Sequence, residues 1–341
     1  MRRAGSISLF LTLATVTALL FLTNLTIGSV RIPVSDVASS LLGEGASKPT
    51  WDYIVQHYRL PKAVTAVLAG MGLSVCGLLM QTLFKNPLAG PYVLGISSGS
   101  SLGVALLIMG SGLLPAAVSH WALSPYGIII FSCLGSLAVL AAVLAIAQKV
   151  TDTASILITG LMFSSFTGAI VGVLSYLTTA EQLQKFTFWA MGNLGDLPWA
   201  SVGILALIVV LGLMLAFVTV KPLDALLLGD TYAYSLGVNL QTVRRLIIVS
   251  TALLAGTITA FAGPIAFVGM AVPHMAKLTF GAGNHKRLFL ATLFYGAAVM
   301  LVCDMASHAP GTDFILPINA VTSIVGAPVV VWLVLKKQRI S

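Results

Sequence analysis

The feature that most constrains this chain is a series of apolar runs, each about 20 residues long and nearly free of charged side chains. A helix needs about 20 mostly apolar residues to cross the hydrocarbon core of a bilayer. Only 8% of the residues are charged, whereas about a quarter are charged in a soluble protein. The sequence therefore predicts an all-α polytopic membrane protein in contact with the lipid bilayer, with one transmembrane domain over residues 1–341.

Runs bounded by charge, Pro or Gly predict ten spans. Their approximate ranges are 6–28, 62–84, 93–113, 124–148, 154–178, 200–220, 241–262, 264–280, 288–306 and 317–335. The first run could also be a signal peptide, but we favour a retained span because the apolar residues continue through Leu25 and Ile27 with no A-x-A pattern after them. The segments 29–58 and 179–199 are long enough to hold surface helices.

The distribution of charge predicts the orientation of these spans. With the N-terminus in the cytoplasm, the cytoplasmic segments hold thirteen of the 18 Lys and Arg residues, and the outer segments hold seven of the 10 acids. Cytoplasmic segments of membrane proteins are enriched in Lys and Arg. We therefore expect both termini in the cytoplasm, and the net charge of +8 reflects topology and predicts no nucleic-acid partner.

Motifs for chemistry are missing from the sequence. It contains no G-x-x-x-x-G-K-[ST] phosphate loop, no H-E-x-x-H and no nucleophile elbow, and its three cysteines lie far apart in apolar runs. We therefore expect a chain that is not an enzyme and binds no cofactor or metal, so that any ATP hydrolysis is carried by a partner chain. The middles of the spans carry almost no ionisable group, which counts against proton coupling. An ion-coupled secondary transporter or channel independent of an ATPase stays the alternative, and a membrane enzyme is a third hypothesis.

Two segments on the predicted cytoplasmic side stand out. Pro87 and Pro91 forbid a continuous helix, and irregular backbone at membrane depth is tolerated where it lines a cavity, so this loop is expected to line a pathway or to form a plain tight turn. Residues 222–238 predict short helices, with Asp230 as an N-cap and Gly237 as a left-handed C-terminal residue. Such a pair of turns is either a rigid knob or an ordinary loop helix.

A set of short motifs in a particular order resembles the FecCD family of permeases, and the resemblance covers nearly the whole chain. The motifs are Arg59-Leu60-Pro61-Lys62, Gln81, Asn86-Pro87-Leu88-Ala89, Gly95 to Gly99, Trp189-Ala190-Met191-Gly192, Gly263-Pro264-Ile265-Ala266-Phe267-Val268-Gly269, Pro273-His274, Leu316-Pro317 and Gly326-Ala327-Pro328.

This resemblance implies an ATP-binding-cassette (ABC) importer of ferric siderophores, haem or cobalamin in the bacterial cytoplasmic (inner) membrane. The implied partners are ABC ATPase subunits, a periplasmic or lipid-anchored substrate-binding protein and a second permease subunit, with a homodimer expected. Gly90-Pro91 and Gly263-Pro264 open helices of opposite predicted direction, which suggests an inverted repeat of spans 2–5 and 7–10.

The resemblance also implies roles for individual residues. The cytoplasmic gate would involve Leu88, Thr153 and Ala154, with spans five and ten lining a central channel. Docking of the binding protein would use Arg59, Lys62 and His308, although His308 stands where the family usually has Arg, and Ile315 replaces the usual acid; snorkelling at a span end is the competing interpretation for the two cations. The residues implied in coupling to the ATPase are Asp224, Leu228, Gly229, Asp230, Ala233, Leu236 and Gly237.

Overall fold

The computed structural model describes residues 2–113, 115, 122–150, 153–195, 197–281, 283–308 and 314–338. These residues are almost entirely helical, and the part of the chain that is described contains no strand beyond an isolated antiparallel bridge between His308 and Ile315. They form two compact units. The first unit comprises Met1–Leu78, Asn193–Leu207 and Ile265–Ser341, and the second comprises Leu79–Gly192 and Ile208–Pro264. The single domain predicted over residues 1–341 stays a prediction.

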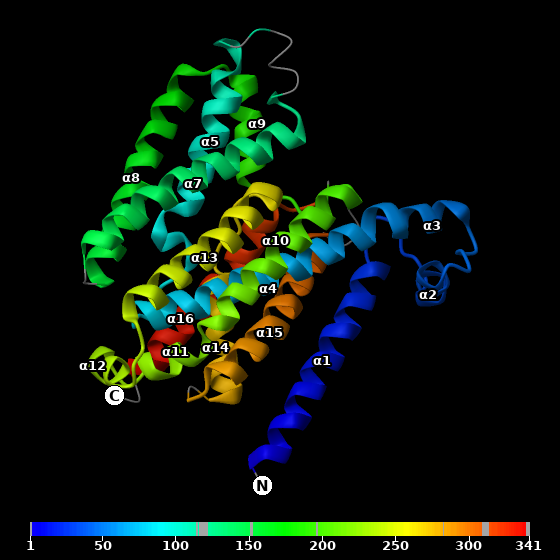
Figure 1. Ribbon diagram of the computed structural model, residues 1–341. Helices are drawn as coiled ribbons and strands as arrows, with labels where there is room; N and C mark the ends of the chain where they lie inside the picture. The colour runs from blue at the N-terminus through cyan, green and yellow to red at the C-terminus, as the bar shows by residue number, and fades with distance from the viewer. Residues whose placement is uncertain are drawn as a thin grey trace. The chain divides into compact units, whose positions relative to one another are not determined.

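The first unit is a helical assembly in which α15 packs against α1, α14 and α16 (Figure 1). Its elements are α1 (Arg2–Thr26), α2 (Val34–Leu42), α3 (Pro49–Ile54), the π-helical turn η1 (Val55–Arg59), the start of α4 (Leu60–Leu83), the start of α10 (Trp199–Val218), α14 (Val268–Phe280), α15 (His285–Ser307) and α16 (Ile318–Gln338).

Glycines bring α4 into backbone contact with α14 and α15. A Cβ placed on Gly70 would lie 2.1 Å from the carbonyl oxygen of Gly296, and one on Gly77 would lie 1.6 Å from that of Gly269. Small residues let helix backbones approach closely in membranes, where lipid supplies no hydrophobic force between helices. These two positions therefore tolerate no side chain.

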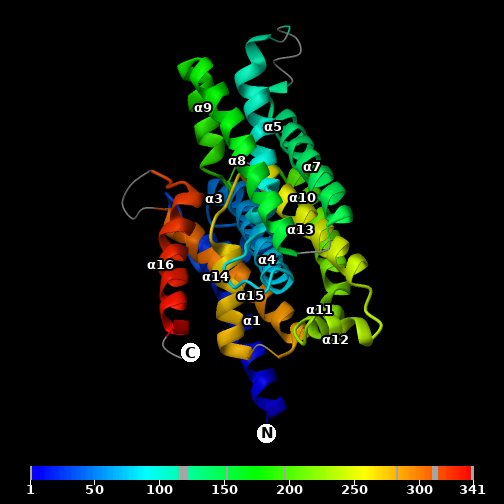
Figure 2. The same cartoon turned by 90° about the vertical axis from the view of Figure 1, so that its left-hand side faces the viewer.

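In the second unit, α5 packs against α7 and α8, and α13 packs against α7 and α5 (Figure 2). Its elements are the end of α4, the 3-10 turn η2 (Pro91–Leu94), α5 (Ile96–Gly110), the turn η3 (Ser111–Leu113), α7 (Pro125–Lys149), α8 (Thr153–Leu177), α9 (Ala180–Ala190), the rest of α10, α11 (Val220–Leu226), α12 (Asp230–Ser235) and α13 (Leu240–Ala262).

Each of the ten predicted ranges holds one helix, and the chain is a polytopic α-helical membrane protein. Within the described residues, seven helices are long and apolar enough to cross a membrane. The helices in the ranges 93–113 and 264–280 are shorter than predicted, with α5 spanning 15 residues and α14 spanning 13. The count of ten spans stays a prediction.

The two short helices share the cause of their late start. Pro91 and Pro264 interrupt the backbone hydrogen-bonding pattern, and each helix then begins after a residue with positive φ, Gly95 at 74° and Phe267 at 65°. This local likeness agrees with the suggested repeat. The inverted repeat itself stays a prediction.

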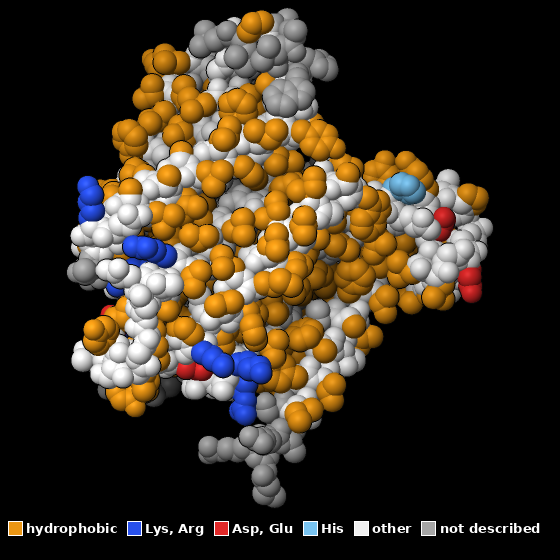
Figure 3. Space-filling view, in the orientation of Figure 1, with side chains coloured by type: hydrophobic (Ala, Val, Ile, Leu, Met, Phe, Trp, Pro, Cys, Tyr) orange, Lys and Arg blue, Asp and Glu red, His pale blue; other side chains and the backbone are white. Residues whose placement is uncertain are grey.

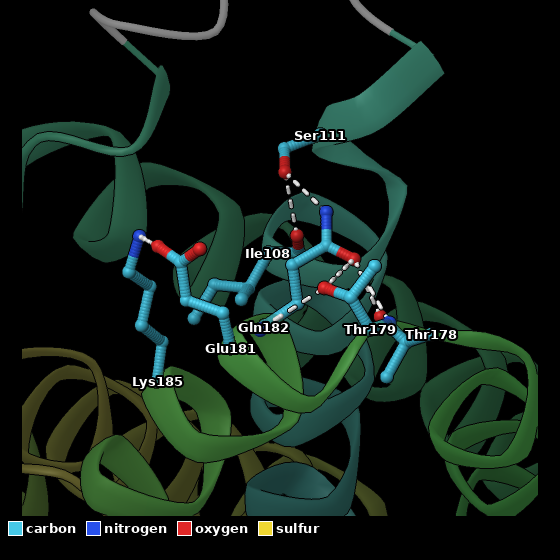
Figure 4. A network of polar contacts seen from close by, with 7 residues as sticks. All are labelled: Ile108, Ser111, Thr178, Thr179, Glu181, Gln182 and Lys185. Carbon is cyan, nitrogen blue, oxygen red and sulfur yellow. Dashed lines mark hydrogen bonds and ion pairs between the residues drawn. The ribbon is translucent and has the colours of Figure 1, made fainter.

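The long segments hold surface helices, as predicted. Figure 4 shows how α9 is fixed at its start: Thr179 and Gln182 form a reciprocal capping box, and Gln182 Nε2 also donates to Ser111 Oγ at 3.0 Å. Ser111 in turn donates to the carbonyl oxygen of Ile108 at 2.7 Å. The start of α9 is therefore bonded to the end of α5.

Hydrophobic side chains cover most of the face shown in Figure 3, and Lys and Arg gather in a few places. Exposed apolar side chains include Leu207 at 62% and Met214 at 62% on α10. Such a surface in a polytopic helical protein faces lipid or a partner, because large contiguous apolar surfaces are rarely left in contact with water.

Candidate functional site

The predicted knob at residues 222–238 is present as the short helices α11 and α12. Gly229, with φ at 106°, is the N-cap of α12, and Gly237, with φ at 79°, follows its end. The prediction for Gly237 is confirmed. The prediction that Asp230 caps the helix is wrong: Asp230 is the first helical residue, and no side chain caps α12.

This knob presents apolar side chains to the surroundings. Leu228 is 65% exposed, Tyr232 52% and Leu236 59%, whereas Ala233 is fully buried. Asp224 lies on α11, where it is half-buried. An exposed apolar rim on a short rigid element is typical of a protein interface, but coupling through these residues stays a prediction.

Asp230 is bonded to the end of α4. Lys85 Nζ lies 2.7 Å from Asp230 Oδ1, although 145 positions separate the two residues. Lys85 is the second residue after α4, with φ at 48°. The pair therefore joins the segment after α4 to α12, both of which are predicted to be cytoplasmic.

A groove of about 690 Å³ lies beside α12 and the start of α13. Its lining combines neutral polar groups with one carboxylate and one guanidinium, and the lining residues are Asp230, Tyr234, Gly237, Val238, Asn239, Leu240, Gln241 and Arg244. A groove of this composition next to an apolar knob offers both shape and hydrogen-bonding groups to a partner.

The predicted gate residues lie in the turn before η2 and at the start of α8. Leu88 is 45% exposed, and its N–H donates to Asn86 Oδ1 at 2.9 Å, which closes a tight turn. The turn η2 follows and packs on α8, where a Cβ on Gly160 would lie 2.1 Å from the carbonyl oxygen of Val93. Thr153 and Ala154 begin α8. The structure therefore brings the turn that follows Leu88 into contact with α8, and a gating role stays a prediction.

In the first unit, polar side chains from α1, α4 and α15 form a buried cluster, which we name the Asp304 cluster: Asn24, Lys62, Asp304 and His308. Lys62 Nζ lies 2.9 Å from Asp304 Oδ1, and Asn24 Nδ2 donates to Asp304 Oδ2 at 2.9 Å. The side chain of Asp304 is 3% exposed and that of Lys62 is 15% exposed. A charge is tolerated at such burial when an opposite charge and hydrogen bonds satisfy it, as they do here.

His308 is the fourth member of the Asp304 cluster, with Nε2 at 2.8 Å from Lys62 Nζ. Because an ammonium group only donates, Nε2 must accept, and the ring is then neutral with its proton on Nδ1. Burial lowers the pKa of His308 below its ordinary value of 6.5; the cations of Lys62 and Arg59 lower it further, and Asp304 opposes them. His308 therefore stays neutral at neutral pH.

Arg59 lies at the end of η1 and binds backbone oxygens. It donates to the carbonyl of Leu25 at 2.8 Å and to that of Val30. Gly28 makes room for it, because a Cβ there would lie 2.8 Å from the guanidinium. These acceptors are neutral, so the positive charge of Arg59 is held in place without being cancelled.

The match to a family model decides the class of this chain. The model of the FecCD transport family matches residues 16–336, which is nearly the whole sequence. The chain belongs to the FecCD transport family. It is therefore a multi-pass transport permease of the cytoplasmic membrane, and the interpretation drawn from its motifs is confirmed.

Individual relatives agree with this FecCD assignment. The hemin transport system permease protein HmuU of Yersinia pestis is 31% identical over 322 residues, 94% of this chain and 95% of that protein. The vitamin B12 import system permease protein BtuC of Citrobacter koseri is 32% identical over 289 residues, 84% of each chain. A solved metal-chelate type ABC transporter in an inward-facing conformation has a TM-score of 0.84 at 27% identity, and the alignment covers 96% of this chain and 99% of that one.

In this FecCD chain, the residues predicted to dock the binding protein already have partners within the chain. The charge of Lys62 is compensated by Asp304, and His308 is neutral. Docking by Arg59, Lys62 and His308 stays a prediction, and of the three only Arg59 has a charge that no acid among the described residues compensates.

Sequence reasoning missed the roles of Asn24 and Lys85. Asn24 is a polar residue in an apolar span, which usually signals a buried partner. Lys85 directly precedes the Asn86-Pro87 break, a position where a left-handed residue often ends a helix. Both signals indicate that a residue is special, but neither identifies its partner.

Proposed function

We propose that this chain forms the membrane pathway of an ABC importer and moves a metal chelate such as haem, cobalamin or a ferric siderophore into the cytoplasm. The observation that carries the proposal is the family match over residues 16–336. Two relatives are permeases for hemin transport and vitamin B12 import, and they supply the class of substrate. No covalent chemistry on this chain is needed for that role.

ATP is bound and hydrolysed by separate ABC ATPase subunits in this proposal. The exposed rim of α12 and the groove beside it are the surface for such a subunit, because they combine apolar side chains with an arginine at a rigid element. Movement of α12 during the ATPase cycle then opens and closes the pathway. Alternating access needs no buried proton relay.

The pathway runs between two permease subunits, with a homodimer as the proposed arrangement, and α8 and α16 line it. The N-terminal part of α8 offers polar but uncharged groups to a passing solute. Thr159 Oγ1 donates to the carbonyl of Ser155 at 2.8 Å, so the hydroxyl is satisfied within its own helix. Groups satisfied in this way bind a bulky solute weakly, which suits release.

A substrate-binding protein delivers the chelate to the opposite side. Arg59 is the residue best suited to attract an acidic partner, because neutral carbonyls orient its guanidinium and leave its charge in place. Exposed charge pairs of this kind contribute mainly to steering and register.

The test uses the tagged chain purified from the membranes that normally hold it. A chain that carries a P-loop motif should co-purify, and the complex reconstituted in vesicles with its binding protein should take up haem, cobalamin or a ferric siderophore only with ATP. The double variant Gly229→Trp with Gly237→Trp should reach the membrane, but its ATP hydrolysis should no longer drive uptake. ATP-independent uptake driven by an ion gradient would overturn the proposal.

A further inference from the structure

Lys85 occupies a backbone position that favours glycine. It follows α4 with φ at 48°, its N–H donates to the carbonyl of Thr82 at 3.3 Å, and the N–H of Asn86 donates to that of Gln81 at 3.2 Å. This pair of bonds is the Schellman motif, whose left-handed residue is usually Gly because a Cβ crowds the backbone there. Among the described residues, Lys85 and Phe267 are the only residues other than glycine that have a positive φ.

The end of α12 shows the same motif with the usual residue. There the N–H of Gly237 donates to the carbonyl of Tyr234 at 2.9 Å and the N–H of Val238 donates to that of Ala233 at 3.1 Å, with φ of Gly237 at 79°. The backbone geometry therefore explains Gly237 fully. It does not explain why a lysine stands at residue 85.

The side chain supplies the explanation. Lys85 Nζ reaches Asp230 Oδ1 at 2.7 Å, and Asp230 opens α12. A carboxylate in the first turn of a helix is also favourable with the helix dipole. Lys85 thus accepts an unfavourable backbone conformation and places a cation on the first residue of the helix expected to meet the ATPase.

The turn after Lys85 leads to the predicted gate. The side chain of Asn86 accepts from the N–H of Leu88 at 2.9 Å, and the N–H of Ala89 donates to the carbonyl of Asn86 at 3.1 Å. The following turn, η2, packs on α8. A hydrogen-bonded turn therefore connects Lys85 to Leu88 and leads on to η2, which packs on α8.

We propose that Lys85 is a positioning residue that ties α12 to the turn carrying Leu88, so that displacement of α12 by an ATPase is passed directly to this turn. This inference rests on the proposed function and adds to it a specific mechanical link. The side chains are 57% and 47% exposed, so the pair contributes little to stability, and its effect lies in coupling.

The test compares three substitutions of Lys85 in the complete importer, reconstituted in vesicles with its ATPase and binding protein. Lys85→Gly and Lys85→Asn both tolerate the left-handed backbone and lack the ammonium, whereas Lys85→Arg keeps a cation. Uptake per ATP hydrolysed should fall about two- to fivefold in the first two variants and stay near the unaltered value in the third. Thermal unfolding of Lys85→Gly should occur at the same or a higher temperature.

Two controls separate this link from other effects of charge. Lys286→Gln removes an exposed cation from the start of α15, outside the knob, and should leave the ratio of uptake to hydrolysis unchanged. Raising the ionic strength should lower the ratio in the unaltered importer and leave it constant in Lys85→Gly, because salt screens an exposed pair.

The outcomes distinguish the inference from the function on which it rests. An unaltered ratio in Lys85→Gly or in Lys85→Asn overturns the role of Lys85 while the importer still works. A chain that retains no ATPase, or that transports without one, overturns the proposed function first. A drop in the ratio in Lys85→Gly and Lys85→Asn, with no drop in Lys85→Arg, supports the link.

Discussion

One helix, α4, carries a Lys–Asp pair near each end, and the two pairs differ in burial far more than in length. Lys62 and Asp304 lie 2.9 Å apart with side chains 15% and 3% exposed, whereas Lys85 and Asp230 lie 2.7 Å apart with side chains 57% and 47% exposed. Both bonds have the geometry of a charge-assisted hydrogen bond. The burial of each pair therefore determines how much free energy is lost when the pair opens.

The two pairs differ because water can solvate the ions of an exposed pair when it opens, but not those of a buried pair. If the exposed pair opens, water solvates both ions and little free energy is lost, so its two side chains can adjust at little cost in stability. If the buried pair opens, a carboxylate is left in a low-dielectric interior with only Asn24 as partner. The Asp304 cluster therefore acts as a fixed joint of α1, α4 and α15, and the Lys85–Asp230 pair acts as an adaptable one.

The largest expected loss of stability comes from removing one partner of the buried Lys62–Asp304 pair. Lys62→Met should destabilise the protein by about 3–5 kcal/mol, because Asp304 would remain buried without a counter-charge. Thermal unfolding in detergent measures this loss. The double variant Lys62→Met with Asp304→Leu should recover most of it, and a single variant as stable as the unaltered chain would contradict the fixed joint.

A smaller effect should come from pushing α4 away from α15. Gly70→Ala places a methyl group 2.1 Å from the carbonyl oxygen of Gly296 and should cost about 1–3 kcal/mol by overpacking. Gly203→Ala on α10 is the matched control, since nothing lies within 4 Å of its added Cβ. Equal unfolding temperatures for the two variants would show that the close approach of α4 and α15 is not needed.

Acidification should weaken the Asp304 cluster more gently, through His308. Its pKa in the folded chain lies below the ordinary 6.5, so the unfolded chain binds a proton first as the pH falls. Stability is therefore full above pH 6.5 and declines below it until His308 also protonates in the folded state. Unfolding measured between about pH 7.5 and about pH 5 should show this decline in the unaltered chain and a smaller one in His308→Gln.

The smallest change in stability should come from the adaptable joint. Asp230→Asn removes the ion pair with Lys85 and should shift the free energy of unfolding by about 1 kcal/mol or less. Unfolding at low and at high salt checks this, because the difference between the variant and the unaltered chain should shrink as salt screens the pair. A loss as large as that of Lys62→Met would erase the contrast between the two joints.

The helices were the most predictable part of this protein. A run of about 20 apolar residues must form a helix in lipid, because hydrocarbon offers no partner for backbone polar groups. The break at Pro87 and Pro91 and the left-handed Gly237 were also predictable, since both depend on local backbone chemistry. The prediction that Asp230 caps α12 was wrong, because its carboxylate binds the distant residue Lys85 instead of the start of its own helix.

The sequence by itself determined the class of protein, the segments that become helices and the family, because each depends on neighbouring residues or on motif order. Only the tertiary structure decided the partners: Asp304 for Lys62, Asp230 for Lys85, and backbone carbonyls for Arg59. The physical reason is that an ion pair depends on distance in space and on burial. Neither quantity can be read from positions that lie 145 residues apart in the chain.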